Sequence, residues 1–502
     1  MSEGAPAPLL SAVARWPDVA EIARSLQGGP RRETLVGLGG SALRVVYGAL
    51  SLGWNGPLLV VVPGEAQAEE ARLDLEASGV ERVAVFPPHP VLPYEVLAES
   101  RHAQDGRLSV LRRLAADENV VVVASVEAAV GRMMPFDVWR RQMISCTVGD
   151  HFDFRALVER LMLLGYERVE RAEANGHLAV RGGIVDLVDP SLEPLRLEFD
   201  GERLESIRRF DLSSQRSLQP RQQVTIAPAD EVVVPALEAQ RGLAQLRRES
   251  AERVRVLRAS RNEPSAITVE ERSAQMIDTW QGRPVGRSAG RFLPFFYQPA
   301  CLVDGLPASA LVVLEEADRL PQAAEHLERE SAHRAEVLLE EGSLLPRQAE
   351  VQVPWRHFER TLRQRAVLAC QQLFHRAASG GVRAIDMRSG ERYGGRWELV
   401  LETMAAARRD GESVLIAAAT KDRLQLVRHR LEDADIPVAW AEGPFLPKAG
   451  MVGAFVGMVS QGFFLPGHRL RVITDQELFG TERRPRRRLD MNGPMRSRRS
   501  IE

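Results

Sequence analysis

Residues 33–65 have the sequence ETLVGLGGSALRVVYGALSLGWNGPLLVVVPGE, and this stretch decides the fold class. It begins with a short apolar run, passes through a Gly-rich turn into a helical pattern, and returns to continuous Leu and Val at 58–62. Apolar runs of this kind are typical of strands buried on both faces of a parallel sheet, with helices packed against them. The stretch therefore predicts a strand-helix-strand unit of the α/β class.

The same alternation extends outward as far as the apolar run at 120–124, and the composition then changes. From about Cys146, one helical pattern is followed by strand-like stretches with short Gly, Asp and Pro turns, which predicts an α+β module inserted into the α/β unit. We predict a first half of an α/β domain at 1–144, the inserted α+β domain at 145–226, a mostly helical second half of the α/β domain at 227–376, a small third α/β domain at 377–482, and a basic flexible linker at 483–502.

Charge and composition exclude several classes of protein. The net charge of −2 argues against strong non-specific attraction to DNA by the chain as a whole. The three cysteines are far apart and lack C-x-x-C spacing, which fits buried thiols in a reducing cytoplasm, and the ten histidines form no metal-ligand pattern. No signal peptide opens the sequence, and no apolar run approaches the ~18 residues of a membrane span. We expect a cytoplasmic chain that binds neither metal nor membrane.

Lysine is almost absent, which bears on nucleotide chemistry. Only two of the 66 basic residues are lysines, Lys421 and Lys448, and neither lies in a G-x-x-x-x-G-K-[ST] phosphate loop. The segment GLGGSALR at 37–44 follows a predicted strand where such a loop would lie. Against the template Gly37 matches, but Ala42 replaces the second glycine, Leu43 the lysine and Arg44 the magnesium-binding hydroxyl. The segment is either an ordinary Gly-rich turn or a degenerate, non-functional phosphate loop.

A second acidic segment favours the degenerate loop. LVVLEEADRL at 311–320 is an apolar strand pattern followed by Glu315 and Glu316. It is similar to a Walker B strand, with Glu315 in the position of the aspartate. Together with the segment at 37–44, it predicts a helicase-like domain that has lost its nucleotide site, and hence no cofactor for this chain.

The region from Tyr166 to Asp211 contains YERVERAEANGHLAVRGGIVDLVDP and LRLEFDGERLESIRRFD. It resembles the second domain of the excision-repair protein UvrB, and more closely the UvrB-like module at the N-terminus of the bacterial transcription-repair coupling factor Mfd. In both families this domain docks onto UvrA. The resemblance implies a UvrA-binding site whose residues here are Tyr166, Arg168, Arg181, Gly182, Arg196 and Glu198. Ala179 departs from the UvrB pattern, which has an arginine there.

Strand periodicity agrees with such a docking surface. In LRLEF at 195–199, the apolar side chains share one face and should pack inward, which leaves Arg196 and Glu198 outward. The same period in GHLAVRG turns Arg181 outward, and we expect Arg168 on that face as well. Exposed arginines are frequent interface anchors because they pair with carboxylates of a partner. The alternative is a solvated strand face with cross-strand ion pairs.

Further resemblance to Mfd extends over almost the whole chain, including GFFLPGHRLRVITDQELFG at 462–480. It implies a module that recruits UvrA to stalled RNA polymerase for nucleotide excision repair and is not itself catalytic. The ATP- and magnesium-dependent motor of the full-length family, and its RNA polymerase and DNA contacts, are expected outside these 502 residues. The alternatives are a UvrB-like ATP-dependent helicase with a divergent nucleotide site, or a protein that binds DNA through the arginines of 483–499.

Overall fold

The computed structural model describes residues 8–89, 101–189, 194–280, 290, 292–372 and 381–480. It divides into two compact units, Leu10–Ile385 and Met1–Leu9 with Asp386–Glu502. The basic linker predicted at 483–502 lies outside the described residues. Both units combine parallel sheets with helices, so the predicted α/β fold class with an inserted α+β module is confirmed.

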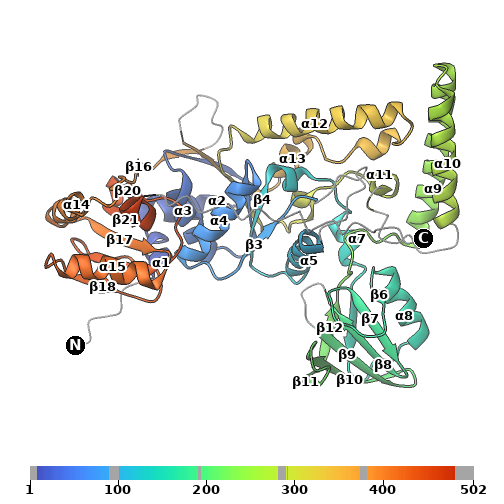
Figure 1. Ribbon diagram of the computed structural model, residues 1–502, viewed down its shortest axis with the longest axis horizontal. Helices are drawn as coiled ribbons and strands as arrows, with labels where there is room; N and C mark the ends of the chain where they lie inside the picture. Colours follow the sequence, from blue (N-terminus) through green and yellow to red (C-terminus); the bar gives the residue numbers. More distant parts are fainter. Residues whose placement is uncertain are drawn as a thin grey trace, which may run out of the picture. The chain divides into compact units, whose positions relative to one another are not determined.

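A seven-stranded sheet forms the centre of the larger unit, in the order β15-β1-β14-β13-β2-β4-β3 (Figure 1). All of its strand pairs are parallel. The central strands are buried along their whole length, as their continuous Leu and Val runs predicted. The strands are β1 (Arg32–Val36), β2 (Leu58–Val62), β3 (Val83–Phe86), β4 (Val121–Ser125), β13 (Leu311–Leu314), β14 (Ala366–Gln371) and β15 (Gly381–Ala384).

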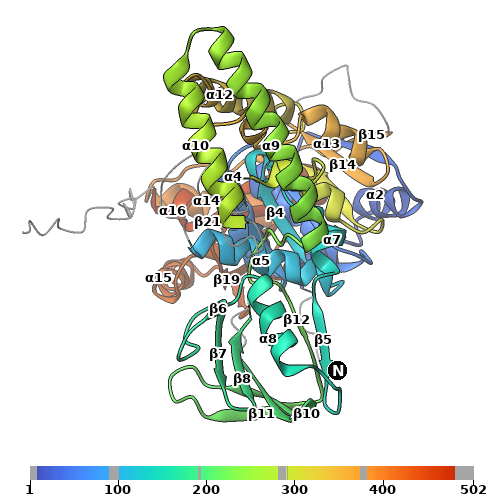
Figure 2. The same cartoon turned by 90° about the vertical axis from the view of Figure 1, so that its right-hand side faces the viewer.

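Helices pack against this sheet and extend from it. α4 contacts β3 and β4, α2 contacts β1 and β14, and α9 and α10 form a long hairpin that Figures 1 and 2 both show. The helices are α1 (Leu9–Val13), α2 (Pro17–Gln27), α3 (Gly40–Leu52), α4 (Glu65–Ser78), α5 (Arg101–Ala115), α6 (Val126–Val130), α7 (Phe136–Arg140), α9 (Ala236–Ala259), α10 (Glu263–Trp280), α11 (Leu293–Phe296), η2 (Leu302–Gly305), α12 (Leu320–Glu340), η3 (Pro346–Ala349) and α13 (Trp355–Leu362).

The inserted module leaves the larger unit after α7 and returns before α9. Its two ends form an antiparallel pair, β5 with β12, and its six-stranded sheet has the order β11-β10-β9-β8-β7-β6. The helix α8 covers one face of that sheet (Figure 2). The elements are β5 (Ile144–Thr147), α8 (Phe154–Leu163), β6 (Glu167–Arg168), β7 (His177–Arg181), β8 (Ile184–Val188), β9 (Pro194–Asp200), β10 (Arg203–Phe210), β11 (Ser217–Arg221) and β12 (Gln223–Ile226).

The smaller unit has its own six-stranded mixed sheet, β16-β20-β21-β17-β19-β18, and a separate core. Its elements are β16 (Arg388–Ser389), α14 (Trp397–Arg409), β17 (Ser413–Ala418), α15 (Lys421–Glu432), β18 (Val438–Trp440), β19 (Val452–Val456), β20 (Phe463–Leu465), η4 (Pro466–His468), β21 (Leu470–Thr474) and α16 (Asp475–Phe479). The predicted third domain starts at 377, whereas β15 still pairs with β1 of the large sheet and this unit begins at Asp386.

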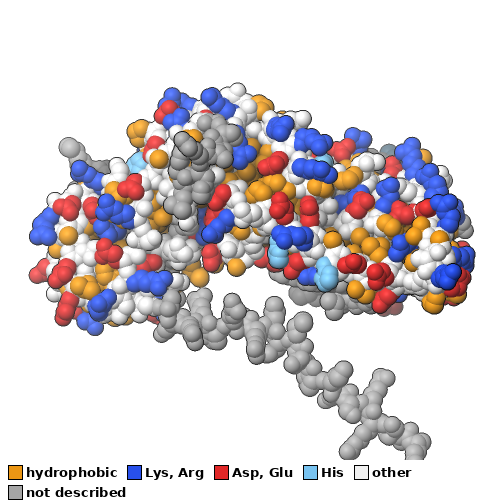
Figure 3. Space-filling model, turned by 90° about the horizontal axis from the view of Figure 1, so that it is seen from above, with side chains coloured by type: hydrophobic (Ala, Val, Ile, Leu, Met, Phe, Trp, Pro, Cys, Tyr) orange, Lys and Arg blue, Asp and Glu red, His pale blue; other side chains and the backbone are white. Residues whose placement is uncertain are grey.

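The surface carries both signs of charge. On the face drawn in Figure 3, arginines and acidic side chains are interspersed, in keeping with the net charge of −2. Among the described residues, no helix has both the length and the apolar character needed to cross a membrane.

Candidate functional site

Side chains along a strand alternate between the two faces of the sheet, and this alternation decides which predicted docking residues of the inserted module face outward. Leu195 and Leu197 of β9 are buried on the side of α8, and Arg196 and Glu198 point to the opposite face, as predicted. Cross-strand pairing then aligns two rows of residues on this outer face. One row is Ala179, Asp186, Arg196 and Arg208, and the other is Arg181, Ile184, Glu198 and Ser206.

In the first row, contacts within the module cover most of the Arg196 and Asp186 side chains. Arg196 Nε donates to Asp186 Oδ1 at 2.7 Å, its terminal nitrogen donates to Oδ2 at 2.9 Å, and its guanidinium lies 5.3 Å from the centroid of the Phe210 ring. Only 16% of the Arg196 side chain is exposed. The bonds to Asp186 raise the pKa of Arg196 above its ordinary value, although partial burial opposes this. Phe210 in turn packs on buried Ala172 and Ala179. Arg196 therefore links β9 to β8 and has little exposed surface for a partner.

The second row is open. Arg181 is exposed and uses one terminal nitrogen to donate to the carbonyl of Glu170 at 2.7 Å. The Glu198 side chain is 35% exposed and lies 3.9 Å from Arg208, whose side chain is 47% exposed. Ile184 lies between Arg181 and Glu198 in the pairing and is 37% exposed. The row therefore presents a cation, an apolar side chain and an anion side by side.

Ile184 was not among the residues that the sequence predicted. A signal was present, since Gly182 and Gly183 form a two-residue turn between paired strands, and the residues that flank such a turn pair directly, which places Ile184 beside Arg181. Gly182 itself has φ of +58°, which suits glycine, so it shapes the turn.

Two other predicted residues lie elsewhere. Arg168 is exposed, but it pairs with Leu178 of β7, so it projects toward the α8 side of the sheet, and the expectation that it shares a face with Arg181 is wrong. The physical reason is that β6 joins the sheet edge as a parallel strand with its own register. Tyr166 is 3% exposed, and its hydroxyl donates to the carbonyl of Ala227 at 2.9 Å. It anchors the core of the module and does not reach the surface.

The degenerate phosphate loop is a short turn. β1 ends at Val36 and α3 begins at Gly40, so three residues connect them, and Leu38 is buried. Gly37 has φ of +95°, and a Cβ atom there would lie 2.4 Å from the carbonyl oxygen of Ile385. A functional phosphate loop wraps several backbone N–H groups around its ligand. Here only three residues connect the strand and the helix, and the carbonyl of Ile385 lies against Gly37.

The following residues of the template are buried in the core. Ala42 and Leu43 are each 1% exposed. Arg44, in the template position of the metal-binding hydroxyl, contacts Glu315 Oε1 at 3.0 Å and Asp74 Oδ2 at 2.8 Å. Glu315 follows β13 in the position of the Walker B acid and also accepts a hydrogen bond from the Tyr47 hydroxyl at 3.1 Å.

We call Arg44, Asp74, Glu315 and Tyr47 the buried ion cluster. Burial disfavours the charge of Arg44, but Glu315, Tyr47 and Asp74 outweigh this effect and raise the pKa of Arg44. Ser41 also donates to Asp74, at 2.9 Å. Glu316, the second predicted acid, has φ of +51° and pairs with Arg319 at the surface. An arginine thus supplies the positive charge beside Glu315 that a magnesium ion supplies beside the acid in a P-loop NTPase.

The chain resembles known proteins both in the inserted module and along most of its length. Residues 144–232 match the family described as UvrB interaction domain. The chain is 28% identical over 470 residues to the transcription-repair-coupling factor of Bacillus subtilis, with 92% of this chain and 39% of that protein covered. It is 27% identical to the factors of Mycobacterium tuberculosis and Myxococcus xanthus, with 93% of this chain covered in each case and 38% and 40% of those proteins.

The chain spans about two-fifths of the length of these curated relatives. The family match coincides with the module that carries the open row of Arg181, Ile184 and Glu198. The chain therefore resembles the N-terminal region of the bacterial transcription-repair-coupling factors and contains a domain of the UvrB interaction type.

Proposed function

We propose that this chain is the protein-interaction region of a transcription-repair coupling factor, and that its inserted module recruits UvrA in nucleotide excision repair. The observation that carries the proposal is the match of residues 144–232 to the UvrB interaction domain. The outer face of that module supports it, because its open row combines Arg181, Ile184 and Glu198. Buried anchors flanked by charges that pair across an interface are the usual composition of a protein-binding site.

The same proposal assigns no ATP hydrolysis and no cofactor to this chain. The buried ion cluster supports this, since Arg44 pairs with Glu315 at 3.0 Å and the turn at Gly37 lies against the carbonyl of Ile385. Contacts with RNA polymerase and DNA, and the ATP-driven motor, would belong to other regions of such a factor. The whole factor would work in the cytoplasm, where the chromosome is transcribed.

The test is a titration of purified UvrA against this chain, with two substitutions in the open row. Arg181→Ala and Ile184→Asp should each weaken binding by about 1–2 kcal/mol, or about five- to thirtyfold, because each removes one central contact. Arg196→Glu should weaken binding too, but through the fold, since it places a carboxylate against Asp186. Circular dichroism separates these two causes.

Arg155→Ala is the matched control. Arg155 lies on α8, on the far side of the sheet, and its side chain is 89% exposed, so its removal should leave the affinity unchanged. Equal affinity of UvrA for the wild type and both open-row variants would refute the assigned surface. Binding of UvrA to none of these proteins would refute the proposed function itself.

The competing function is a UvrB-like helicase with a divergent nucleotide site. ATP hydrolysis that disappears in Glu315→Gln would favour it over a docking module. Salt-sensitive DNA binding that is lost when residues 483–502 are deleted would instead favour a DNA-binding role for the basic segment.

A further inference from the structure

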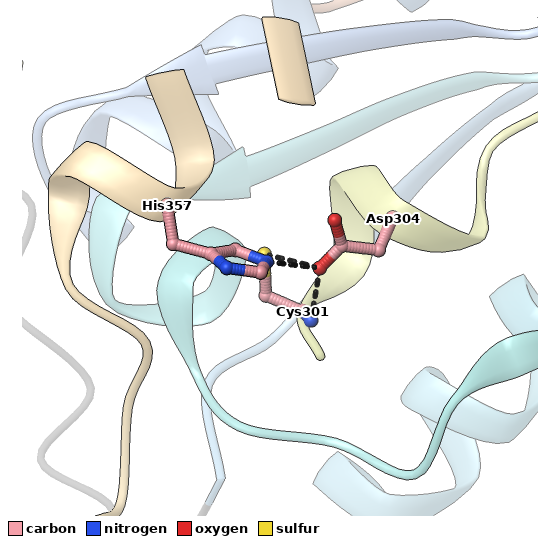
Figure 4. Close-up of side chains that lie close together, drawn as sticks. All are labelled: Cys301, Asp304 and His357. Atoms are coloured by element: carbon pink, nitrogen blue, oxygen red, sulfur yellow. Dashed lines mark hydrogen bonds and ion pairs between the residues drawn. The ribbon is translucent and has the colours of Figure 1, made fainter. Parts of the chain in front are cut away.

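A group of three metal-ligand side chains lies away from both sites described above. Cys301 precedes η2, Asp304 belongs to η2, and His357 belongs to α13, and Figure 4 shows the three converging on one carboxylate oxygen. Their sulfur, oxygen and nitrogen atoms all lie within 4.8 Å of one another. No sequence pattern reveals the group, because 53 residues separate Asp304 from His357.

Two distances in the group lie close to those that a tetrahedral cation imposes. Zinc lies about 2.3 Å from sulfur and about 2.0–2.1 Å from nitrogen and oxygen, so neighbouring ligand atoms of a tetrahedral site are about 3.3–3.6 Å apart. Cys301 Sγ is 3.4 Å from Asp304 Oδ2, and His357 Nε2 is 3.0 Å from the same oxygen. The first distance falls within this range, and the second is about 0.3 Å below it.

Hydrogen bonding alone explains the group poorly. Asp304 Oδ2 faces the backbone N–H of Cys301 at 2.9 Å, and also the thiol and the imidazole, although one carboxylate oxygen has about two lone-pair sites. Nor does the start of η2 require a sulfur atom, since Ser, Thr, Asp and Asn are the effective residues at that position and a thiol accepts hydrogen bonds weakly.

A cation would resolve this competition. We infer that Cys301 Sγ, Asp304 Oδ2 and His357 Nε2 form a binding site for a divalent cation of the zinc class, with water as the fourth ligand. Thiolate, imidazole and carboxylate together select zinc or cobalt over magnesium and calcium, which prefer oxygen ligands alone. Thr361 Oγ1 donates to Asp304 Oδ1 at 2.8 Å and would orient the carboxylate from behind.

The site is partly exposed to solvent. Cys301 is 1% exposed, whereas the side chains of Asp304 and His357 are 25% and 31% exposed, so a hydrated cation can reach them and retain a water. Because a cysteine binds metal as the thiolate, binding would break the S–H bond of Cys301, form the sulfur–metal bond and release that proton to the buffer.

The position of the site suggests what the cation does. A Cβ atom on Gly305, at the end of η2, would lie 2.6 Å from the Cβ of Phe136, which is the first residue of α7. η2 thus packs on the last helix before the inserted module, and α13 packs on η2. A cation that joins η2 to α13 would stiffen the base on which the module is mounted.

The test uses the full chain, freed of metal with a chelator, kept reduced with a phosphine and titrated with Co²⁺. We expect one equivalent to produce a thiolate-to-cobalt charge-transfer band and the intense visible bands of four-coordinate cobalt, both abolished by excess Zn²⁺. Cys301→Ser should remove the charge-transfer band. His357→Gln can still donate to Asp304 but is a poor ligand, so it should keep the fold and weaken Co²⁺ binding by more than the about 10- to 100-fold typical of outer-shell changes.

Cys146→Ala is the control, because Cys146 is a buried thiol outside the group and should leave the spectrum unchanged. A charge-transfer band that survives in Cys301→Ser would overturn the site. So would weak, octahedral cobalt spectra that are the same in all four proteins. Neither result would bear on UvrA binding, which the open row of the module carries separately.

Discussion

Removal of Arg44 should destabilise the larger unit more than the removal of any surface arginine. The Arg44 side chain is 3% exposed, and its two carboxylate partners, Asp74 and Glu315, are 1% and 4% exposed. Arg44→Met keeps most of the side-chain volume but leaves both carboxylates in the core without a cation. Breaking a buried ion pair by removing one partner costs about 3–5 kcal/mol, and we expect a loss of this size in the free energy of unfolding.

A second substitution separates the charge effect from packing. Glu315→Gln still accepts the hydrogen bond of the Tyr47 hydroxyl and leaves Arg44 paired with Asp74, so it should cost about 1–3 kcal/mol. In the double variant Arg44→Met with Glu315→Gln, one of the two uncompensated carboxylates is gone. The double variant should therefore be more stable than the sum of the single losses predicts, by about 0.5–3 kcal/mol.

The assay is urea unfolding followed by far-ultraviolet circular dichroism, with hydrogen exchange of α3 and β13 to locate the loss in the larger unit. Arg72→Met is the matched control. Arg72 lies on the same helix as Asp74 and pairs with Glu69 and Glu76, but both acids are about half exposed. Exposed pairs contribute about 0–1 kcal/mol. If Arg44→Met costs no more than Arg72→Met, the buried ion cluster is not the stabilising element that the structure indicates.

Two further predictions concern local geometry. Gly37→Ala should cost about 1–3 kcal/mol of unfolding free energy in the same urea assay, because φ is +95° and the new Cβ would meet Ile385, whereas Gly53→Ala, in open space, should cost little. Asp211 accepts hydrogen bonds from the Ser213 hydroxyl and from Ser214, which lower its pKa to about 2. Because the folded pKa is depressed, this contribution to stability should be complete above about pH 4 and should be lost as the pH falls through about 2. An Asp211 carboxyl resonance that titrates near pH 4 would contradict the turn geometry.

The strands and their inward faces were predictable because both depend on neighbours in sequence. The run at 58–62 needed only its own apolar character to predict β2, and the two-residue period placed Arg196 and Glu198 on the outer face of β9. Contacts between distant segments were not predictable in this way. Nothing in LRLEF indicates that Asp186 holds Arg196, since this depends on the register of β8 with β9.

The same limit applied to the other clusters. Arg44 and Glu315 are 271 residues apart, and the sequence indicated only that each departs from its template. In the structure Arg44 and Glu315 form an ion pair, so the two departures from the template are in direct contact. The face of Arg168 was predicted wrongly because β6 has only two residues, which is too short for the alternation of apolar and polar residues to show its register. Ile184 was not predicted because an apolar residue in a strand is usually buried, whereas Ile184 begins β8 on the outer face and is 37% exposed.

The pairing of β5 with β12 bears on whether the inserted module can be removed from the chain. Ile144 and Ile226 are partners in the antiparallel pair, so the first and last residues of the inserted module are cross-strand neighbours, about 5 Å apart at Cα. A short reverse turn joining the flanking chain would close the gap if the module were cut out. The module could equally be transplanted into a surface hairpin of an unrelated carrier. We expect the transplanted module to fold in the carrier and to keep the binding preference that it has in this chain.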